Sequence, residues 1–123
     1  MEHLQNLYYA LAELAYAIAK ADGQIQFEEK KIIHDIVITE LKRNNFYFEN
    51  LELVVRFIQI DDMPIETIYT EALDVIKNNS FYLDKSLKEK FIDVIQQIAI
   101  AFPPVTESEK SIIDRFKRDI NRI

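Results

Sequence analysis

Residues 14–33 read LAYAIAKADGQIQFEEKKII and contain the only glycine in a chain of 123 residues. Helices often end with a residue in the left-handed conformation, which glycine adopts without a steric penalty from a Cβ atom. Gly23 therefore predicts the end of one helix, and Ile25 is expected to fold back against that end. The acidic residues Glu28 and Glu29 favour the positive N-terminus of a second helix. The stretch predicts a helix, a tight turn and another helix.

Apolar residues recur at helical spacing along nearly the whole chain. They define six segments, at residues 4–18, 32–41, 51–58, 65–76, 87–102 and 112–120. The first segment is expected to bury one face. Segment 51–58 also alternates from Leu51 to Phe57 as a strand would, so a strand stays an alternative there. As a helix, it is expected to face the core through Leu51, Val54, Val55 and Ile58.

Several helix starts carry capping signals. Thr106 and Glu109 have the spacing of a capping box, which predicts a helix that begins between them. Asp84 is expected to cap the start of the helix at residues 87–102. Asp62 is expected to cap the start of the helix that has Pro64 in its first turn. We therefore expect an all-α fold, in which residues 1–123 form one compact bundle of six to seven helices.

A weak internal repeat relates residues 14–33 to residues 94–113 without a gap. Each copy predicts a helix, a tight turn and a second helix that is opened by a glutamate, and a shared pattern of this kind indicates a duplicated unit. The bundle is therefore expected to contain two pseudo-repeated helical hairpins. The matched pairs include Ile18 with Ile98, Ala19 with Ala99, Glu29 with Glu109, Lys30 with Lys110 and Ile33 with Ile113.

Composition narrows the class of protein. Hydrophobic residues make up 49% of the chain and charged residues 29%, which is typical of a globular domain. The absence of cysteine excludes disulfides, zinc–thiolate sites and thiol nucleophiles. The net charge of -6 argues against nucleic-acid binding, which depends on neutralising phosphates. The sequence has no basic leader and no apolar segment of bilayer length, so we expect a cytoplasmic protein without direct membrane insertion.

Asp22 is harder to explain as a structural residue. It follows the first predicted helix, where a carboxylate meets the negative end of the helix dipole. A lysine, a backbone amide or a metal ion would relieve this contact. The spacing from Asp22 to Glu29 matches the second half of an EF-hand loop. The first two ligand positions would be Ile18 and Lys20, which cannot coordinate calcium, and this argues against an EF-hand.

The stretch from Leu14 to Ile33 resembles the signature of the TerB-like domains, which include the tellurite-resistance protein TerB and the N-terminal domain of DjlA-type membrane co-chaperones. The matching features are an alanine-rich helix end, the tripeptide Ala21-Asp22-Gly23, an apolar residue two positions later and Glu29 at the start of the next helix. The resemblance implies two pseudo-symmetric helical hairpins. It also implies a role in stress responses or in resistance to phage and toxic oxyanions.

The same resemblance implies a divalent metal site built from acidic residues at the two turns. Transferred by position, its ligands would be Asp22, Glu29 and Glu109. This chain departs from the pattern in its second copy, where Phe102-Pro103 replaces the aspartate and glycine. A symmetric site would therefore lose one ligand.

The residue inventory does not suggest an enzyme. A single glycine excludes a glycine-rich phosphate loop, and no serine or threonine lies on a recognisable nucleophile turn. His3 is close to the start of the chain, and His34 is expected to lie at the edge of a helix. Adjacent carboxylates such as Glu28 and Glu29 point apart on a helix.

Two functional interpretations remain. In the first, a TerB-like module contacts other proteins in a stress response and binds a divalent cation. In the second, a ligand-free structural module acts as a homodimer or an adaptor, and its contact surface consists of aromatic loop residues. These residues are Phe46, Tyr47, Phe48, Phe81 and Tyr82.

Overall fold

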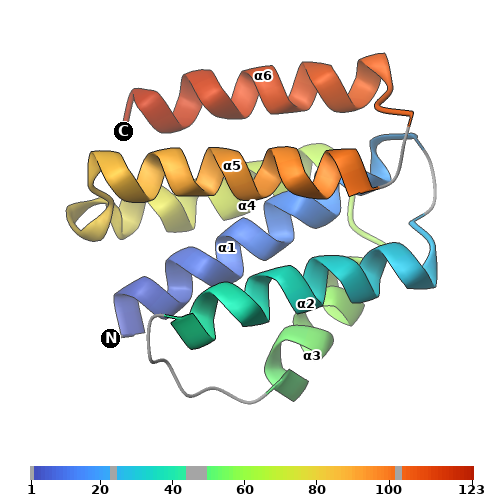
Figure 1. Cartoon of the computed structure of the whole chain (residues 1–123), viewed down its shortest axis with the longest axis horizontal. Coiled ribbons are helices and arrows are strands. Elements are labelled where there is room, and N and C mark those ends of the chain that lie inside the picture. Colours follow the sequence, from blue (N-terminus) through green and yellow to red (C-terminus); the bar gives the residue numbers. More distant parts are fainter. Residues whose placement is uncertain (1, 23–24, 44–49, 102–103) are drawn as a thin grey trace.

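The computed structural model describes residues 2–22, 25–43, 50–101 and 104–123 (Figure 1), with the side chains of 2, 22, 40–42 and 50–52 excepted. Six α-helices and two 3₁₀ turns follow one another along the chain. They are α1 (Glu2–Ala19), η1 (Lys20–Asp22), α2 (Phe27–Arg43), α3 (Asn50–Ile60), α4 (Ile65–Asn78), η2 (Ser80–Tyr82), α5 (Lys85–Ala101) and α6 (Glu107–Asn121).

The fold is all-α, as the sequence predicts. The described ranges contain no β-strand, and residues 51–58 lie in α3, so the strand alternative for this segment is wrong. Figure 1 shows that α1 and α2 are antiparallel, that α5 and α6 are antiparallel, and that both connecting turns lie at the same end of the molecule. The turn η1 also contacts α6. The two halves of the sequence repeat therefore form two helical hairpins whose turns are neighbours.

Helix α1 is the centre of the structure. Every side chain from Leu7 to Ile18 is buried except that of Glu13. Helix α1 contacts each of the other five α-helices, and it crosses the middle of the molecule in Figure 1. The sequence predicted one buried face, whereas the structure buries all faces. Alanines explain the difference, because a side chain this small lets neighbouring helices approach closely. They are Ala10, Ala12, Ala15 and Ala17.

Helix α3 turns a different face to the core from the one that the sequence predicted. The residues that contribute to the core are Leu53, Phe57 and Ile60, and the ring of Phe57 lies 5.2 Å from that of Tyr16 between centroids. Helix α3 carries apolar residues on both sides, so hydrophobic spacing alone does not tell which side is inward. The side chain of Leu51 is outside the described residues. The other three predicted core residues are exposed: Val54, Val55 and Ile58.

Two of the predicted caps are confirmed. The backbone amide of Glu109 donates a hydrogen bond to Oγ1 of Thr106 at 3.2 Å, so the capping box opens α6. The amide of Leu87 donates to Oδ1 of Asp84 at 2.8 Å, which caps α5. These helix starts depend on residues three positions apart, and the sequence therefore reveals them.

The predicted cap of α4 is wrong. Pro64 occupies the N-cap position, without a side-chain hydrogen bond, and its carbonyl accepts the amide of Ile68 at 3.1 Å. Proline fits here because it has no amide hydrogen to satisfy at a helix start. Asp62 lies two residues before the cap and has an exposed side chain.

An ion pair connects α3 to the central helix. Nη1 of Arg56 donates to Oε1 of Glu13 at 3.1 Å, and the guanidinium also lies 4.5 Å above the ring of Tyr9. Burial raises the pKa of Glu13, and the nearby Arg56 opposes that rise. Arg56 therefore compensates for the burial of a carboxylate in the most buried helix.

Replacing Arg56 with alanine is expected to leave this carboxylate buried without its cation. The free energy of unfolding should fall by about 2 kcal/mol at neutral pH, a moderate value because Arg56 is partly exposed. Burial favours the protonated form of Glu13, so stability from this group is present at acid pH and is lost as pH rises through the raised pKa. The effect of Arg56→Ala should therefore shrink toward acid pH.

Urea unfolding at several pH values measures this effect. The double variant Glu13→Gln/Arg56→Ala serves as the control, because it carries no buried charge and should recover most of the stability. An equal loss at acid and neutral pH would contradict the interpretation.

Candidate functional site

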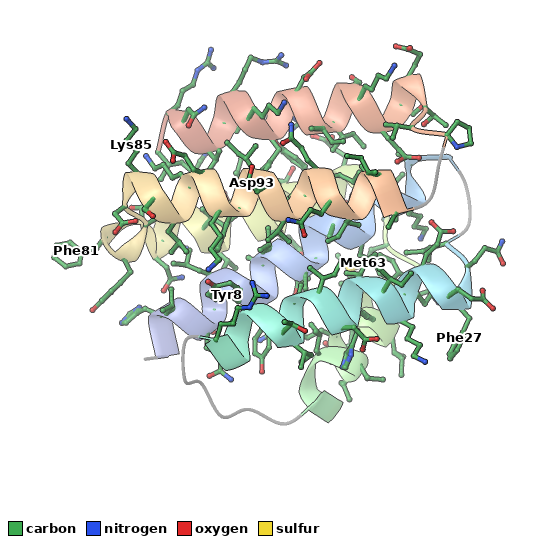
Figure 2. All side chains as sticks on the ribbon, viewed as in Figure 1. Tyr8, Phe27, Met63, Phe81, Lys85 and Asp93 are labelled. Carbon is green, nitrogen blue, oxygen red and sulfur yellow. The ribbon has the colours of Figure 1, made fainter. Side chains whose placement is uncertain are left out.

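A surface groove with a volume of about 480 Å³ lies between α2 and α3. We call it the α2–α3 groove. Figure 2 shows Phe27, at the start of α2, projecting away from the body of the molecule beside it. The lining residues are Phe27, Lys30, Lys31, His34, Val54, Phe57, Ile58, Asp61 and Asp62.

The walls of the α2–α3 groove are mainly apolar. Phe27 is 74% exposed and Ile58 is 70% exposed, and Val54 is also accessible between them and the base. Phe57 contributes from the buried side of α3. Contiguous apolar surface of this kind marks an interaction site in a globular protein, because isolation from water would stabilise it.

A polar cluster fixes one end of the groove. The hydroxyl of Tyr16 donates to Oδ1 of Asp61, and Nζ of Lys30 lies 3.2 Å from the same oxygen. Lys20 donates to the backbone carbonyl of Asp61. The cluster joins α1, η1 and α2 to the turn after α3, and it therefore sets the distance between the two walls of the groove.

The electrostatics of the cluster follow from these contacts. The hydrogen bond from Tyr16 and then that from Lys30 hold the pKa of Asp61 below its usual range. Burial raises the pKa of Tyr16 well above its usual value, and the hydrogen bond to Asp61 adds to the rise. At neutral pH the aspartate is ionised and the tyrosine keeps its proton.

His34 was expected at a helix edge, and the structure places it in the wall of the groove. Its Nδ1 lies 3.3 Å from Oδ1 of Asp35. Its Nε2 is buried and has no hydrogen-bond partner in the part of the chain that the structure describes. The imidazole lies in the α2 wall of the groove together with Phe27, Lys30 and Lys31.

Two of the predicted metal ligands lie at one cavity. Glu29 and Glu109 line a void of about 10 Å³ between the two hairpins, close to the smallest volume that admits a water molecule. The side chain of Asp22 lies outside the described residues, and its backbone forms the end of η1. The other lining residues are Ile18, Ala19, Ile33, Ile98 and Ala99, which include two further pairs related by the repeat.

Both glutamates also serve the helices that they open. Oε1 of Glu29 accepts the backbone amide of Gln26 at 3.2 Å, and Glu109 belongs to the capping box with Thr106. Each glutamate is the third residue of its helix. The two matched positions of the repeat therefore have the same place at a helix start. Within the described residues, no group of three His, Asp or Glu side chains is placed to hold a metal ion.

The predicted aromatic surface is described only in part. Phe46, Tyr47 and Phe48 lie outside the described residues. Phe81 projects from η2 at the far side of the molecule from Phe27 (Figure 2). The ring of Tyr82 stacks on His3 with 4.8 Å between centroids, which anchors the turn to α1.

Sequence reasoning did not identify the α2–α3 groove. The signal that points to it is the excess of apolar residues on α3, where Val54 and Ile58 remain after Leu53 and Phe57 have entered the core. Phe27 is a second signal, because it directly precedes Glu28 and Glu29 and belongs to none of the apolar stripes in the sequence.

Comparisons with known proteins gave no match, whether with models of protein families, with curated proteins or with solved structures. Among the helices described, none has both the length and the apolar character required to cross a membrane. The fold and the groove are therefore interpreted from their own geometry.

Replacing Asp61 with asparagine should weaken the cluster that joins the groove walls. We expect a loss of about 1 kcal/mol in unfolding free energy at pH 7, since the carboxylate is partly exposed. The pKa of Asp61 is lowered in the folded state, so its stabilisation is present above the ordinary carboxyl pKa and is lost as pH falls through the lowered one.

The melting temperatures of the wild type and Asp61→Asn should therefore converge in strong acid. Thermal melting followed by circular dichroism across the acid range tests this. Asp93→Asn, at an exposed position of α5, is a control that should leave the curve unchanged. A difference that persists at the most acid pH would exclude ionised Asp61 as its cause.

Proposed function

We propose that this protein is a non-catalytic, TerB-like interaction module that binds another protein through the α2–α3 groove. The resemblance at residues 14–33 suggests a role in a stress response, such as resistance to tellurite or another toxic oxyanion. The observation that carries the proposal is the exposure of Phe27, from α2, and Ile58, from α3, at one groove.

The openness of the groove favours a protein over a small molecule. Sites for small molecules enclose most of the ligand surface. Here Phe27 and Ile58 are each more than two-thirds exposed, so they form a surface that a partner can cover. Charged residues, Lys31 and Asp62 among them, surround the apolar centre, and protein interfaces have the same arrangement of an apolar core with a polar rim.

Burial of Phe27 and Ile58 in an interface is expected to contribute substantially to the free energy of binding. Complete burial of a side chain such as phenylalanine or isoleucine contributes about 1.5–3 kcal/mol. Two such anchors, at Phe27 and Ile58, suit the small central cluster that usually dominates the affinity of an interface.

Ile58→Asp tests this proposal. The variant places a charge in the groove and should abolish partner binding, because the carboxylate would lose its water on burial. Ile100→Asp is a matched control, since Ile100 is 68% exposed on α5 and lines none of the described depressions. Proteins that co-purify with the tagged wild type and with Ile100→Asp should be missing from Ile58→Asp.

Equal melting temperatures for the three proteins would show that folding is unaffected. Recovery of the same proteins with Ile58→Asp as with the wild type would contradict the proposal.

A divalent cation at the junction of the two hairpins is a second candidate, with Asp22, Glu29 and Glu109 as its ligands. It is supported by the position of Glu29 and Glu109 at the same small cavity. Divalent cations such as calcium are bound by carboxylate oxygens, which both residues can supply. The ion would stabilise the contact between hairpins, and the groove would remain the binding surface.

Thermal melting with calcium, magnesium, manganese and zinc tests the cation. At a concentration one hundred times its dissociation constant, a bound ion adds about 2.7 kcal/mol, which corresponds to a rise of several degrees. Glu109→Gln should abolish the rise, whereas Glu107→Gln, at an exposed carboxylate in the same helical turn, should retain it. If no cation raises the melting temperature, the ligand-free alternative is the correct one.

A further inference from the structure

The geometry points to a second copy of this chain as the partner of the α2–α3 groove. In this assembly the grooves of two protomers face each other across a two-fold axis, and Lys31 of each protomer meets Asp62 of the other. The inference rests on the proposed function, because it names the partner of the same surface.

The position of the exposed apolar side chains is the first argument. Seven large hydrophobic side chains are exposed among the described residues, and four of them lie on α2 and α3. Of the remaining three, Tyr82 stacks on His3, Phe81 packs edge-on against Tyr82, and Ile100 stands alone on α5. The α2–α3 groove is therefore where apolar surface gathers on the described part of the molecule.

Shape is the second argument. A two-fold interface uses the same patch on both subunits, so the patch must carry both a projection and a hollow that fits it. Phe27 supplies the projection (Figure 2), and the adjacent groove of about 480 Å³ supplies the hollow. Phe27 of each protomer would enter the groove of the other, so one interface would cover both phenyl rings.

Charge is the third argument. Lys30 and Asp61 neutralise each other at 3.2 Å, whereas Lys31 and Asp62 are exposed and make no hydrogen bond or ion pair within the described ranges. The groove thus presents one unpaired charge of each sign. A second copy carries both charges on the same patch, and if Lys31 of one protomer contacts Asp62 of the other, a two-fold axis repeats that pairing with the roles exchanged.

The balance of charge also favours this face for self-association. The chain as a whole carries a net charge of -6, so two copies repel each other over most of their surface. The groove contains two lysines and two aspartates, and with neutral histidine its charges cancel. Two copies can meet here without local repulsion.

Reciprocal charge reversal tests the dimer. Analytical ultracentrifugation at rising micromolar concentrations should show the wild type moving from a monomer of 14.5 kDa toward twice that mass. Lys31→Glu and Asp62→Lys should each weaken the dimer by about tenfold or more, since each places two pairs of like charges in contact. An equimolar mixture of the two variants should dimerise as the wild type does, because both contacts then join opposite charges.

Three further variants accompany the mixture. Lys85→Glu changes the net charge as Lys31→Glu does, but it lies at the start of α5, on the other side of the molecule (Figure 2), and should leave the dimer intact. Ile58→Asp should be monomeric, and it should melt at the wild-type temperature at low concentrations, where the wild type is also monomeric. The double variant Lys31→Glu/Asp62→Lys should dimerise with itself.

Three outcomes would overturn the inference. They are a wild type that stays monomeric at all concentrations, a dimer that neither charge reversal weakens, and a mixture that fails to associate when both variants are folded. A monomeric wild type whose co-purifying proteins are still lost with Ile58→Asp would refute the dimer while leaving the proposed function in place. A dimer that Ile58→Asp and the charge reversals dissociate, together with unchanged co-purification of other proteins, would support the inference and contradict the binding of those proteins through the groove.

Discussion

The structure depends on the burial of α1 on all sides. This helix brings no charged residue into the core except Glu13, and its alanines allow five other helices to pack against it. The polar groups of this helix need partners, because a buried hydroxyl or carboxylate is costly without a hydrogen bond or an ion pair. Glu13 is satisfied by Arg56 and Tyr16 by Asp61. Both partners lie on α3 or just after it, so these two contacts with α1 determine the position of α3.

The α2–α3 groove is a consequence of that placement. Leu53 and Phe57 enter the core, which leaves Val54 and Ile58 on the solvent side of a short helix. The pair Lys30 and Asp61 holds α2 at a set distance from the end of α3. Apolar residues that the core does not use then line an open groove together with Phe27. A surface with this composition is stabilised when a partner covers it, which is the basis of the proposed function.

The two hairpins meet where the repeat is strongest. Ile18 and Ile98, Ala19 and Ala99, and Glu29 and Glu109 contribute matching side chains to a single small cavity. Small apolar residues let the helix ends approach, and the two glutamates begin α2 and α6 in the same way. A simple structural role therefore explains both glutamates, and the cation remains a proposal that adds to this role.

The sequence by itself determined the features that depend on neighbours within a few residues. These include the six helices, the caps at Asp84 and Thr106, and the duplicated hairpin, because hydrogen bonds and side-chain period within a helix are local. The sequence-based predictions of the inward face of α3 and of the cap of α4 were wrong, and the sequence did not reveal the groove. Only the tertiary structure decided which apolar face of α3 the core takes, that Glu29 and Glu109 share a cavity, and that Phe27 and Ile58 line one groove. The reason is physical: these relations join residues distant in the chain, and they follow from how whole helices pack around α1, which no local pattern contains.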